Sequence, residues 1–593
     1  MSEIPPELDT SLADSLHEHL SAGRVKEALD VTADNRFHAC LKSNCSDTIR
    51  VLTEFLTTKT FNENPEVYGA CEDILKTVTS VAAPQEVLLE LMAAMEESSW
   101  DQSLFKSLLK ALQLCILRLP ENKILSIDHA LNAVFKHVVS LSAESTSHCY
   151  SEERQKVLES DKEVTDFLTR HITLTLFLEP LREEFIKVPL PTPINFPEKS
   201  KRSVLIKFLM KLLGKGSFPK LHLKAEETPI NTYTRQCSGF YVDSITDLLG
   251  GDPFSILPWI EERFRWSGKK DKKTFCIFLN EVKIPSTSLM IFFYVIFVGK
   301  QIPSQSPKIY SPIYIFEIIL YLITSSLENP YNEVKMKAVE LLQASLENLE
   351  LKALKTNHLE LQIHANLCLS LTNLMIYNES EDIRKTSIDT FRSYLRKFDD
   401  EGRFVIIEKL FDKYQHDASN FRGFLTTQFK DFVAEILTTE ENRFPVQDRF
   451  DRIFNRHLTT LRDRETTDLV QEAEAIIASL NTIRFLALRD LKNCTSFWDR
   501  VPELHINYLH HIRKSLDLGR AHYEAEKIKI ENNEDEDISE KISVNIREKS
   551  LPKLSKKQKL FVMNNSLMKL DLIESVLARV NECLNNVPEF LAN

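Results

Sequence analysis

The sequence predicts an all-α fold, an irregular HEAT-like helical-repeat solenoid whose long C-terminal helix docks back after a disordered connector. Gly and Pro number only 12 and 23 in 593 residues, and strands would need more Gly for their turns. Apolar residues recur at steps of three and four over most of the chain, which is typical of amphipathic helices. From Lys283 onward, helix-sized segments follow one another with a period of roughly 40 residues per helix pair.

Composition places the chain among globular proteins, with 43% hydrophobic and 27% charged residues. The net charge is −12, from 74 basic and 86 acidic side chains. Such a surface disfavours non-specific binding to nucleic acid or to an anionic membrane, and we expect neither as a partner. The longest apolar runs, Leu289–Val298 and Pro312–Ile323, fall short of the ~20 residues that a membrane-spanning helix needs. We interpret them as the most buried pair of helices.

The ten cysteines include no CxxC pair. Met1–Thr10 is acidic and lacks the basic and apolar regions of a signal peptide. These features predict reduced cysteines in a cytoplasmic protein, with the nucleus as a second expected location.

The first predicted region, residues 1–270, is a series of short amphipathic helices. Pro65 and Pro84 each open a helix, because proline costs nothing in a first helical turn. Leu104–Leu119 is apolar nearly all round, as expected for a helix covered on both sides. The segment from Pro180 to Pro197 contains five prolines, so it is predicted as an extended crossover rather than a helix. The charged turn Lys269–Lys273 predicts the end of this region.

The second predicted region, residues 271–526, ends in two helices between Glu472 and Glu526. Ile476, Leu480 and Ile483 share one face of the first helix. The polar run Asn493–Ser496 offers caps and predicts a break, after which the second helix begins. Trp498 follows the break; the choice between core residue and interface anchor stays open, with core favoured.

A charged connector at residues 527–558 is predicted to be disordered, because an acidic block (Ile528–Glu540) is followed by a basic block (Lys541–Lys559) with few apolar residues. The region 559–593 then forms the C-terminal helix. Its apolar stripe recurs at steps of three and four from Leu560 to Leu584. Burying that stripe is worth roughly 1.5–3 kcal/mol per large side chain, which outweighs loop closure, so the helix should dock on its predecessors.

No catalytic motif is found. His38, Cys40 and Cys45 lack a close fourth ligand for zinc, so ordinary buried cysteines are favoured over a metal site. His510 and His511 are better explained as a solvated basic helix face than as catalytic groups. Neither GxGxxG nor GxxxxGK[ST] occurs, which excludes the standard phosphate-binding loops. We therefore expect no enzyme activity, no cofactor and no metal.

Four segments near the C-terminal end carry a resemblance to a known family: RAHYEAE at Arg520–Glu526, Leu572–Val580, IASLN at Ile477–Asn481 and RFL at Arg484–Leu486. They resemble the glomulin family, which is also called the FK506-binding-protein-associated protein family. Arg520–Glu526, RAHYEAE, resembles the family's KAHYEAE, and Leu572–Val580 resembles its LIESVLARV. Ile477–Asn481, IASLN, is similar to its IMASLN, and Arg484–Leu486 is similar to the RYL that follows. The resemblance extends over most of the chain and is densest after Gln471.

The resemblance implies an all-helical HEAT-like protein that is not an enzyme. It implies that the C-terminal region binds the RING domain of the RING-box subunit of cullin-RING ubiquitin ligases. That binding would cover the surface where the charged ubiquitin-conjugating enzyme docks and so inhibit ubiquitin transfer. It also implies FK506-binding proteins as further partners.

On this basis Arg513, Arg520, Tyr523 and Arg579 are the candidate partner-binding residues. The competing explanation is that the shared motifs reflect packing between helices. A general solenoid scaffold or trafficking adaptor with an unrelated partner is the alternative function, since composition fits both.

Overall fold

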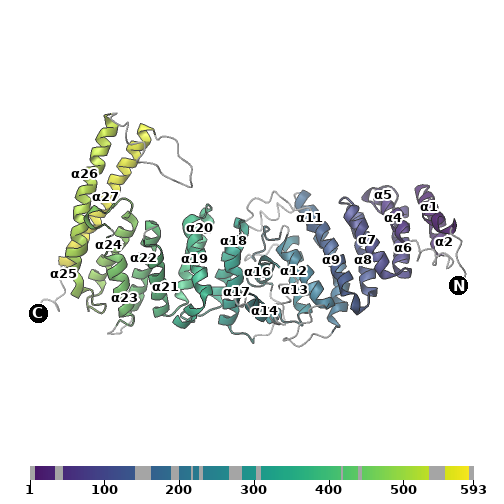
Figure 1. The fold of residues 1–593 in the computed structure, drawn as a ribbon, viewed down its shortest axis with the longest axis horizontal. Helices are drawn as coiled ribbons and strands as arrows, with labels where there is room; N and C mark the ends of the chain where they lie inside the picture. Colours follow the sequence, from purple (N-terminus) through teal and green to yellow (C-terminus); the bar gives the residue numbers. More distant parts are fainter. Residues whose placement is uncertain are drawn as a thin grey trace. The chain divides into compact units, whose positions relative to one another are not determined.

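The computed structural model describes residues 7–33, 45–139, 162–188, 200–215, 218–225, 232–265, 284–301, 309–415, 418–438, 444–461, 463–532 and 555–585. Within these ranges the chain forms helices and no strand, and the only β-type pairing is an isolated bridge between Leu354 and Phe398. The helices pack in tandem on their sequence neighbours (Figure 1), which confirms the predicted all-α solenoid.

The chain divides into two compact units. Unit 1 comprises residues 1–348 with Leu369–Leu371, and unit 2 comprises the rest. The α-helices of unit 1 are α1 (Glu7–Ser21), α2 (Val25–Ala33), α4 (Cys45–Phe55), α5 (Thr58–Glu63), α6 (Pro65–Val81), α7 (Pro84–Glu97), α8 (Gln102–Arg118), α9 (Ile124–Val139), α11 (Lys162–Ile186), α12 (Lys201–Gly214), α13 (Tyr233–Leu248), α14 (Leu257–Arg265), α16 (Ser286–Phe297), α17 (Pro312–Leu327) and α18 (Asn332–Glu347).

Unit 2 carries the remaining helices, two of which continue as short π-helical turns. Its α-helices are α19 (Gln362–Tyr377), α20 (Glu381–Arg396), α21 (Asp400–Lys413), α22 (Ser419–Leu437), α23 (Gln447–Ile453), α24 (Ala473–Arg489), α25 (Val501–Leu504), α26 (His510–Glu531) and α27 (Lys556–Asn585). The π-helical turns are η4 (Phe454–Leu458) and η7 (His505–Leu509).

The two apolar runs form a heavily buried pair of helices in unit 1, as predicted. In α16 every residue from Ser288 to Ile296 is buried, and α17 buries residues on nearly all sides of its second half. The two helices pack on each other and both pack on α18. A helix that is apolar all round is stable only when it is covered on all sides, which these neighbours provide.

The prediction of an extended crossover from Pro180 was wrong at its start. Helix α11 continues through Pro180 to Ile186. Proline has no N–H to donate to the carbonyl of Leu176, one turn earlier. The side chain of Gln113, on α8, donates to that carbonyl at 3.3 Å and to the carbonyl of Phe177 at 2.7 Å. A tertiary contact therefore replaces the missing hydrogen bond. Residues 189–199 of the predicted crossover lie outside the described residues.

Helices α22 and α24 approach each other closely enough to involve the backbone. A Cβ atom on Gly423 would lie 2.9 Å from the carbonyl oxygen of Glu474. At the same ends of the helices, Arg422 pairs with Glu472, and the backbone N–H of Ala475 donates to Ser419 Oγ at 3.4 Å. These contacts join the N-terminal ends of both helices, so the pair runs parallel.

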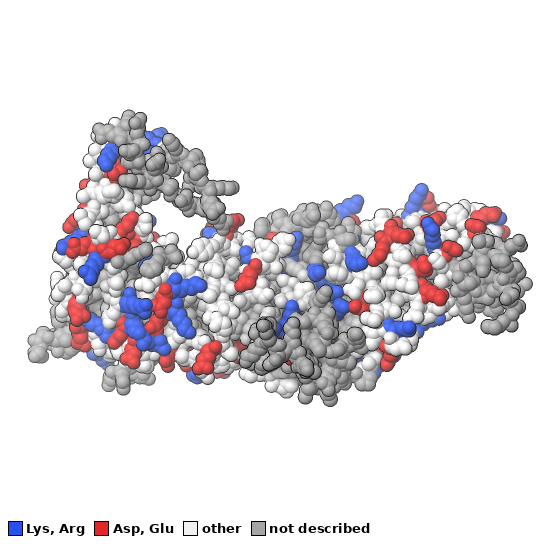
Figure 2. Space-filling view, viewed as in Figure 1, with Lys and Arg blue, Asp and Glu red and all other residues white. Residues whose placement is uncertain are grey.

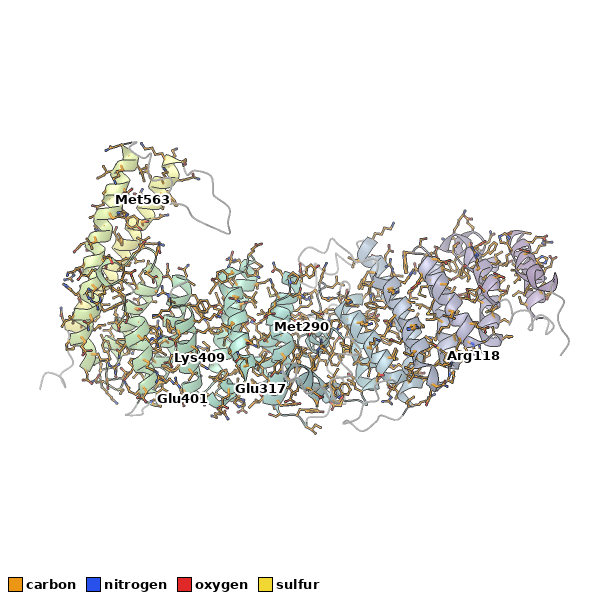
Figure 3. The ribbon with its side chains drawn as sticks, in the orientation of Figure 1. Arg118, Met290, Glu317, Glu401, Lys409 and Met563 are labelled. Carbon is orange, nitrogen blue, oxygen red and sulfur yellow. The ribbon has the colours of Figure 1, made fainter. Side chains whose placement is uncertain are left out.

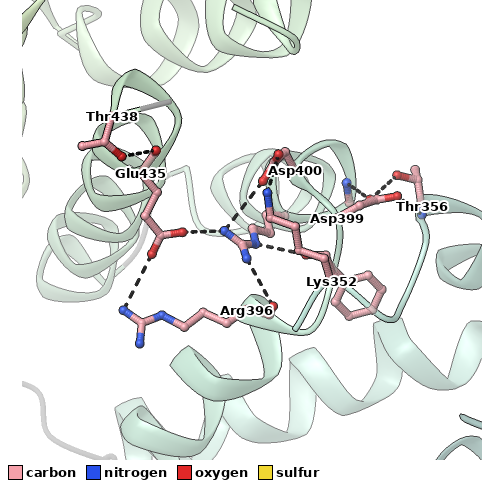
Figure 4. A network of polar contacts seen from close by, with 10 residues as sticks. Lys352, Thr356, Arg396, Asp399, Asp400, Glu435 and Thr438 are labelled. Carbon is pink, nitrogen blue, oxygen red and sulfur yellow. Dashed lines mark hydrogen bonds and ion pairs between the residues drawn. The ribbon is translucent and has the colours of Figure 1, made fainter. Parts of the chain in front are cut away.

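A network of polar contacts connects α20, α21 and α22 (Figure 4). It includes the buried side chain of Arg403. Arg403 donates to the carbonyl oxygens of Phe398 and Arg396 at 3.1 and 3.2 Å, and to Glu435 Oε2 at 2.7 Å. Glu435 also lies 3.8 Å from the guanidinium of Arg396. Because Arg403 is only 3% exposed, its charge is stable there only through these partners.

The predicted domain limits remain predictions. The boundary between residues 270 and 271 falls in 266–283, which lie outside the described residues. Most of the predicted connector, residues 533–554, also lies outside them. At its two edges the chain is helical, since α26 continues to Glu531 and α27 begins at Lys556. The C-terminal helix docks back on α24 and α26, as predicted.

Candidate protein-binding surface

Helices α26 and α27 form a long antiparallel pair that extends past the neighbouring helices of unit 2 (Figure 1). Met563 lies toward the free end of this pair (Figure 3). The buried side of α27 consists of Met563, Ser566, Leu570, Ile573, Leu577, Val580 and Leu584. Six of these seven belong to the apolar stripe predicted from the sequence, so the stripe is a packing surface.

Of the four predicted partner-binding residues, Arg513 and Arg579 are exposed. Arg513 lies in the first turn of α26, and Arg579 lies in the C-terminal part of α27. Both side chains can therefore be reached by another protein.

Arg520 makes contacts within the chain. Its Nη2 atom lies 2.7 Å from Asp571 Oδ1 and 2.6 Å from Glu574 Oε2, both on α27. Next to it, the backbone at Gly519 faces Leu570, so that an added Cβ would lie 3.7 Å from that side chain. Arg520 thus joins α26 to α27, which supports the packing explanation of its motif.

Tyr523 is half-buried and also has a partner within unit 2. Burial, together with the negative charge of Asp468 and the hydrogen bond to its carboxylate, raises the pKa of the Tyr523 hydroxyl to about 12. The Tyr523 hydroxyl is therefore protonated at neutral pH and donates to Asp468, which connects α26 to the segment before α24.

A second, exposed stripe on α27 was not recognised in the sequence. Phe561 and Met568 are 66% and 67% exposed, and Leu572 is 51% exposed. Steps of seven and four residues place them on one face of the helix, and a further step of seven reaches Arg579. The sequence did contain a signal for this second stripe, because these apolar residues lie outside the three-and-four pattern of the buried stripe. Exposed apolar side chains that share a face commonly mark a protein-binding site.

Several charged residues elsewhere on unit 2 are paired between neighbouring helices. Arg449 and Arg452, on α23, both bind Glu408 of α21, at 2.7 and 2.8 Å. Arg456 lies 3.4 Å from Asp412 in the same way. Figure 2 shows both signs of charge interspersed on the displayed face of unit 2. Among the described residues on this face, the mixture gives no extended surface of one sign that would attract a nucleic-acid backbone.

The remaining candidate residues have structural surroundings. Trp498 is buried and its indole N–H donates to the carbonyl of Asp490 at 3.0 Å, which confirms it as a core residue. His511 lies 3.4 Å from Glu465, and His510 is exposed. Cys45 is buried, whereas His38 and Cys40 lie outside the described residues. In the part of the chain that the structure describes, no group of three or more His, Cys, Asp or Glu side chains could hold a metal ion.

None of the helices in the described ranges combines the length and the apolar character needed to cross a membrane.

Comparison with known proteins agrees with the motifs. The model of a protein family described as YAP/Alf4/glomulin matches residues 287–560, which include most of α16 and all helices up to α26. Glomulin from Mus musculus is 24% identical over 568 residues, which cover 95% of this chain and 91% of that protein. Glomulin from Homo sapiens is 24% identical over 574 residues, with the same coverage. The chain is therefore similar to the YAP/Alf4/glomulin family in its C-terminal half and to two glomulins over most of its length.

Proposed function

We propose that this protein inhibits cullin-RING ubiquitin ligases by binding the RING domain of their RING-box subunit. The bound chain masks the surface on which the ubiquitin-conjugating enzyme docks. Similarity to the glomulin family supports this function, and the exposed stripe on α27 is the observation that carries it. At least half of the surface of each apolar side chain in this stripe is exposed, for Phe561, Met568 and Leu572 alike. This area is available to a partner.

The four candidate residues contribute to this surface in two ways. Arg513 and Arg579 contact the RING domain directly, because both are exposed. Arg520 and Tyr523 act by holding α26 in place, through Asp571 and Glu574 in one case and Asp468 in the other. An exposed arginine beside apolar side chains is a common composition for an interface anchor.

Inhibition in this mechanism is competitive and needs no chemical step. Two proteins cannot bury the same surface at once, and an interface of roughly 1,600 Å² is enough for a specific complex. The protein is accordingly a binding protein without cofactor or catalytic residues. FK506-binding proteins are proposed as further partners, and the cytoplasm, with the nucleus, as the location.

The test uses the full chain and a purified cullin–RING-box complex, with binding and ubiquitin transfer measured in the same samples. The double variant Met568→Glu and Leu572→Glu should weaken binding at least tenfold, because it places charges where apolar contact is needed. Transfer should recover in parallel. The control is Leu89→Glu, which changes a comparably exposed leucine on α7 of unit 1.

Equal binding by the double variant and the wild-type protein would exclude α27 as the contact surface. Absence of binding by the folded wild-type chain would overturn the proposed function. Binding that leaves ubiquitin transfer unaffected would favour the alternative, a solenoid scaffold or trafficking adaptor.

A further inference from the structure

A groove lies between α22 and α24 of unit 2, and its volume is about 390 Å³. The groove begins one helical turn beyond the close contact between Gly423 and Glu474. From there on, the residues of α22 and α24 that face the groove have side chains. Its walls are formed by Thr427, Lys430, Ala478, Asn481, Thr482, Arg484, Phe485 and Leu488. The volume falls in the range of sites that hold a few side chains of a ligand.

Several residues of the IASLN and RFL segments line the groove and are not buried between helices, so helix packing does not account for their resemblance to the family motifs. Within these segments Ser479, Leu480 and Leu486 are buried among the helices of unit 2. In contrast, Ala478, Asn481, Arg484 and Phe485 line the groove. Half of the resemblance at α24 thus lies on a surface.

Both walls of the groove carry a cation. Arg484 belongs to α24, and its Nε atom is buried without a hydrogen-bond partner. Lys430 belongs to α22, and its ammonium lies 3.5 Å from Asp431, the next residue of its own helix. A buried guanidinium N–H without an acceptor is costly, and an incoming carboxylate would satisfy it with a charge-assisted hydrogen bond. Because part of the guanidinium is already removed from water, less desolvation opposes that bond.

Apolar side chains continue the groove beyond the cations. Phe485 is half-buried, and Leu488, one turn after Arg484, is 51% exposed. The Asn481 amide lies one turn on the other side and can bond to a peptide backbone. The lining therefore presents hydrogen-bond donors for a carboxylate next to a surface for a large apolar side chain.

We infer that the groove between α22 and α24 binds a short acidic peptide segment of a partner protein. A carboxylate of the segment is held by Lys430 and Arg484, and a large apolar side chain of the same segment packs on Phe485 and Leu488. In a chain with a net charge of −12, a groove with two cations provides the charge complementarity that selects such a segment. A single aromatic ring gives no series of stacking platforms, which disfavours single-stranded nucleic acid. This site is separate from the exposed face of α27 and does not rest on the proposed function.

The test measures fluorescence anisotropy of a synthetic peptide, Gly-Glu-Glu-Leu-Phe-Gly-amide with a fluorophore on its N-terminal amine, on adding the full chain. A second peptide carries Gln in place of both Glu residues. The acidic peptide should bind saturably, and the Gln peptide should bind at least roughly tenfold more weakly, as expected for loss of a charge-assisted bond. Binding of the acidic peptide should weaken with added salt.

Variants of the chain locate the site. Arg484→Ala should weaken binding of the acidic peptide roughly tenfold or more, and Leu488→Ala should weaken both peptides by a smaller factor. Arg489→Ala is the matched control, since Arg489 is an exposed arginine at the end of the same helix and does not line the groove. Circular dichroism establishes that each variant is folded.

Several outcomes would overturn the inference. One is the absence of saturable binding when the chain is added up to about 1 mM, where a site with a Kd of about 1 mM would be half filled. The others are equal binding of the acidic and Gln peptides, and equal losses for Arg484→Ala and Arg489→Ala. Displacement of the peptide by a single-stranded oligonucleotide of equal charge, at equal concentration, would indicate a general anion site instead and would also overturn it.

Discussion

The pairs α22–α24 and α26–α27 lie in the same unit but are held together by different means. In α22–α24 the contact is so close that the backbone takes part, and Gly423 has no room for a side chain. In α26–α27 the helices are separated by side chains, and Gly519 faces Leu570 at an ordinary van der Waals distance. The second pair relies on the apolar stripe of α27 and on the ion pairs of Arg520.

The difference separates surfaces that tolerate change from those that do not. A contact through backbone atoms adapts poorly, because each helix's own hydrogen bonds fix its backbone and no rotamer change can make room. A contact through side chains can repack, and exposed ion pairs contribute little. We therefore expect mutations at the α22–α24 contact to affect folding, and mutations on the outer face of α27 to affect binding alone.

The largest expected effect is on the buried stripe of α27. Ile573→Ala should lower the free energy of unfolding of unit 2 by about 2–5 kcal/mol, because it leaves a cavity in a fully buried position. Met568→Ala, on the exposed face of the same helix, should change it by no more than about 0.5 kcal/mol. Urea unfolding followed by circular dichroism measures both. Similar effects for the two variants would mean that α27 does not dock through this face.

Two glycine substitutions compare the pairs directly. Gly423→Ala should destabilise unit 2 by about 1–3 kcal/mol, since the new Cβ would lie 2.9 Å from the backbone oxygen of Glu474. Gly519→Ala should stabilise it by about 0.5–1 kcal/mol, because alanine fits there and favours the helix. The same urea experiment decides. A destabilising Gly519→Ala would show that α26 and α27 also need a close approach.

Removing the ion pairs should have a smaller effect. Arg520→Ala should cost up to about 1 kcal/mol, because all three partners are substantially exposed and surface pairs are weak. A double-mutant cycle with Glu574→Gln isolates the coupling. If binding to the cullin–RING-box complex falls at least tenfold while stability is unchanged, Arg520 contacts the partner directly and does not only position α26.

An effect that is absent at neutral pH concerns alkaline conditions. The pKa of Tyr523 is raised from 10 to about 12 in the folded chain, so unfolding lets the hydroxyl lose its proton more readily. Its contribution to stability is present below pH 10 and is lost as the pH rises through about 12. Tyr523→Phe should therefore lose less stability than the wild-type protein over this window. Parallel curves from alkaline unfolding of the two proteins would exclude the contribution.

The sequence by itself determined the helical class, the buried pair α16–α17 and the docking of α27. These follow from local periodicity and from the need to bury an apolar face, which do not depend on knowing the neighbours. The motifs also indicated a similarity to the glomulin family, and the comparisons found the same similarity.

Tertiary structure alone decided which residues of those motifs are free to bind. Arg520 and Tyr523 follow the same helical spacing as exposed residues, yet Asp571, Glu574 and Asp468 engage them from distant parts of the chain. In the same way, α11 continues past Pro180 although proline disfavours a helix interior, because Gln113 donates to the carbonyl that proline leaves without a partner. The spacing of residues along one helix predicts which of them share a face. The side chains that contact that face come from distant segments, so only the packed structure identifies them.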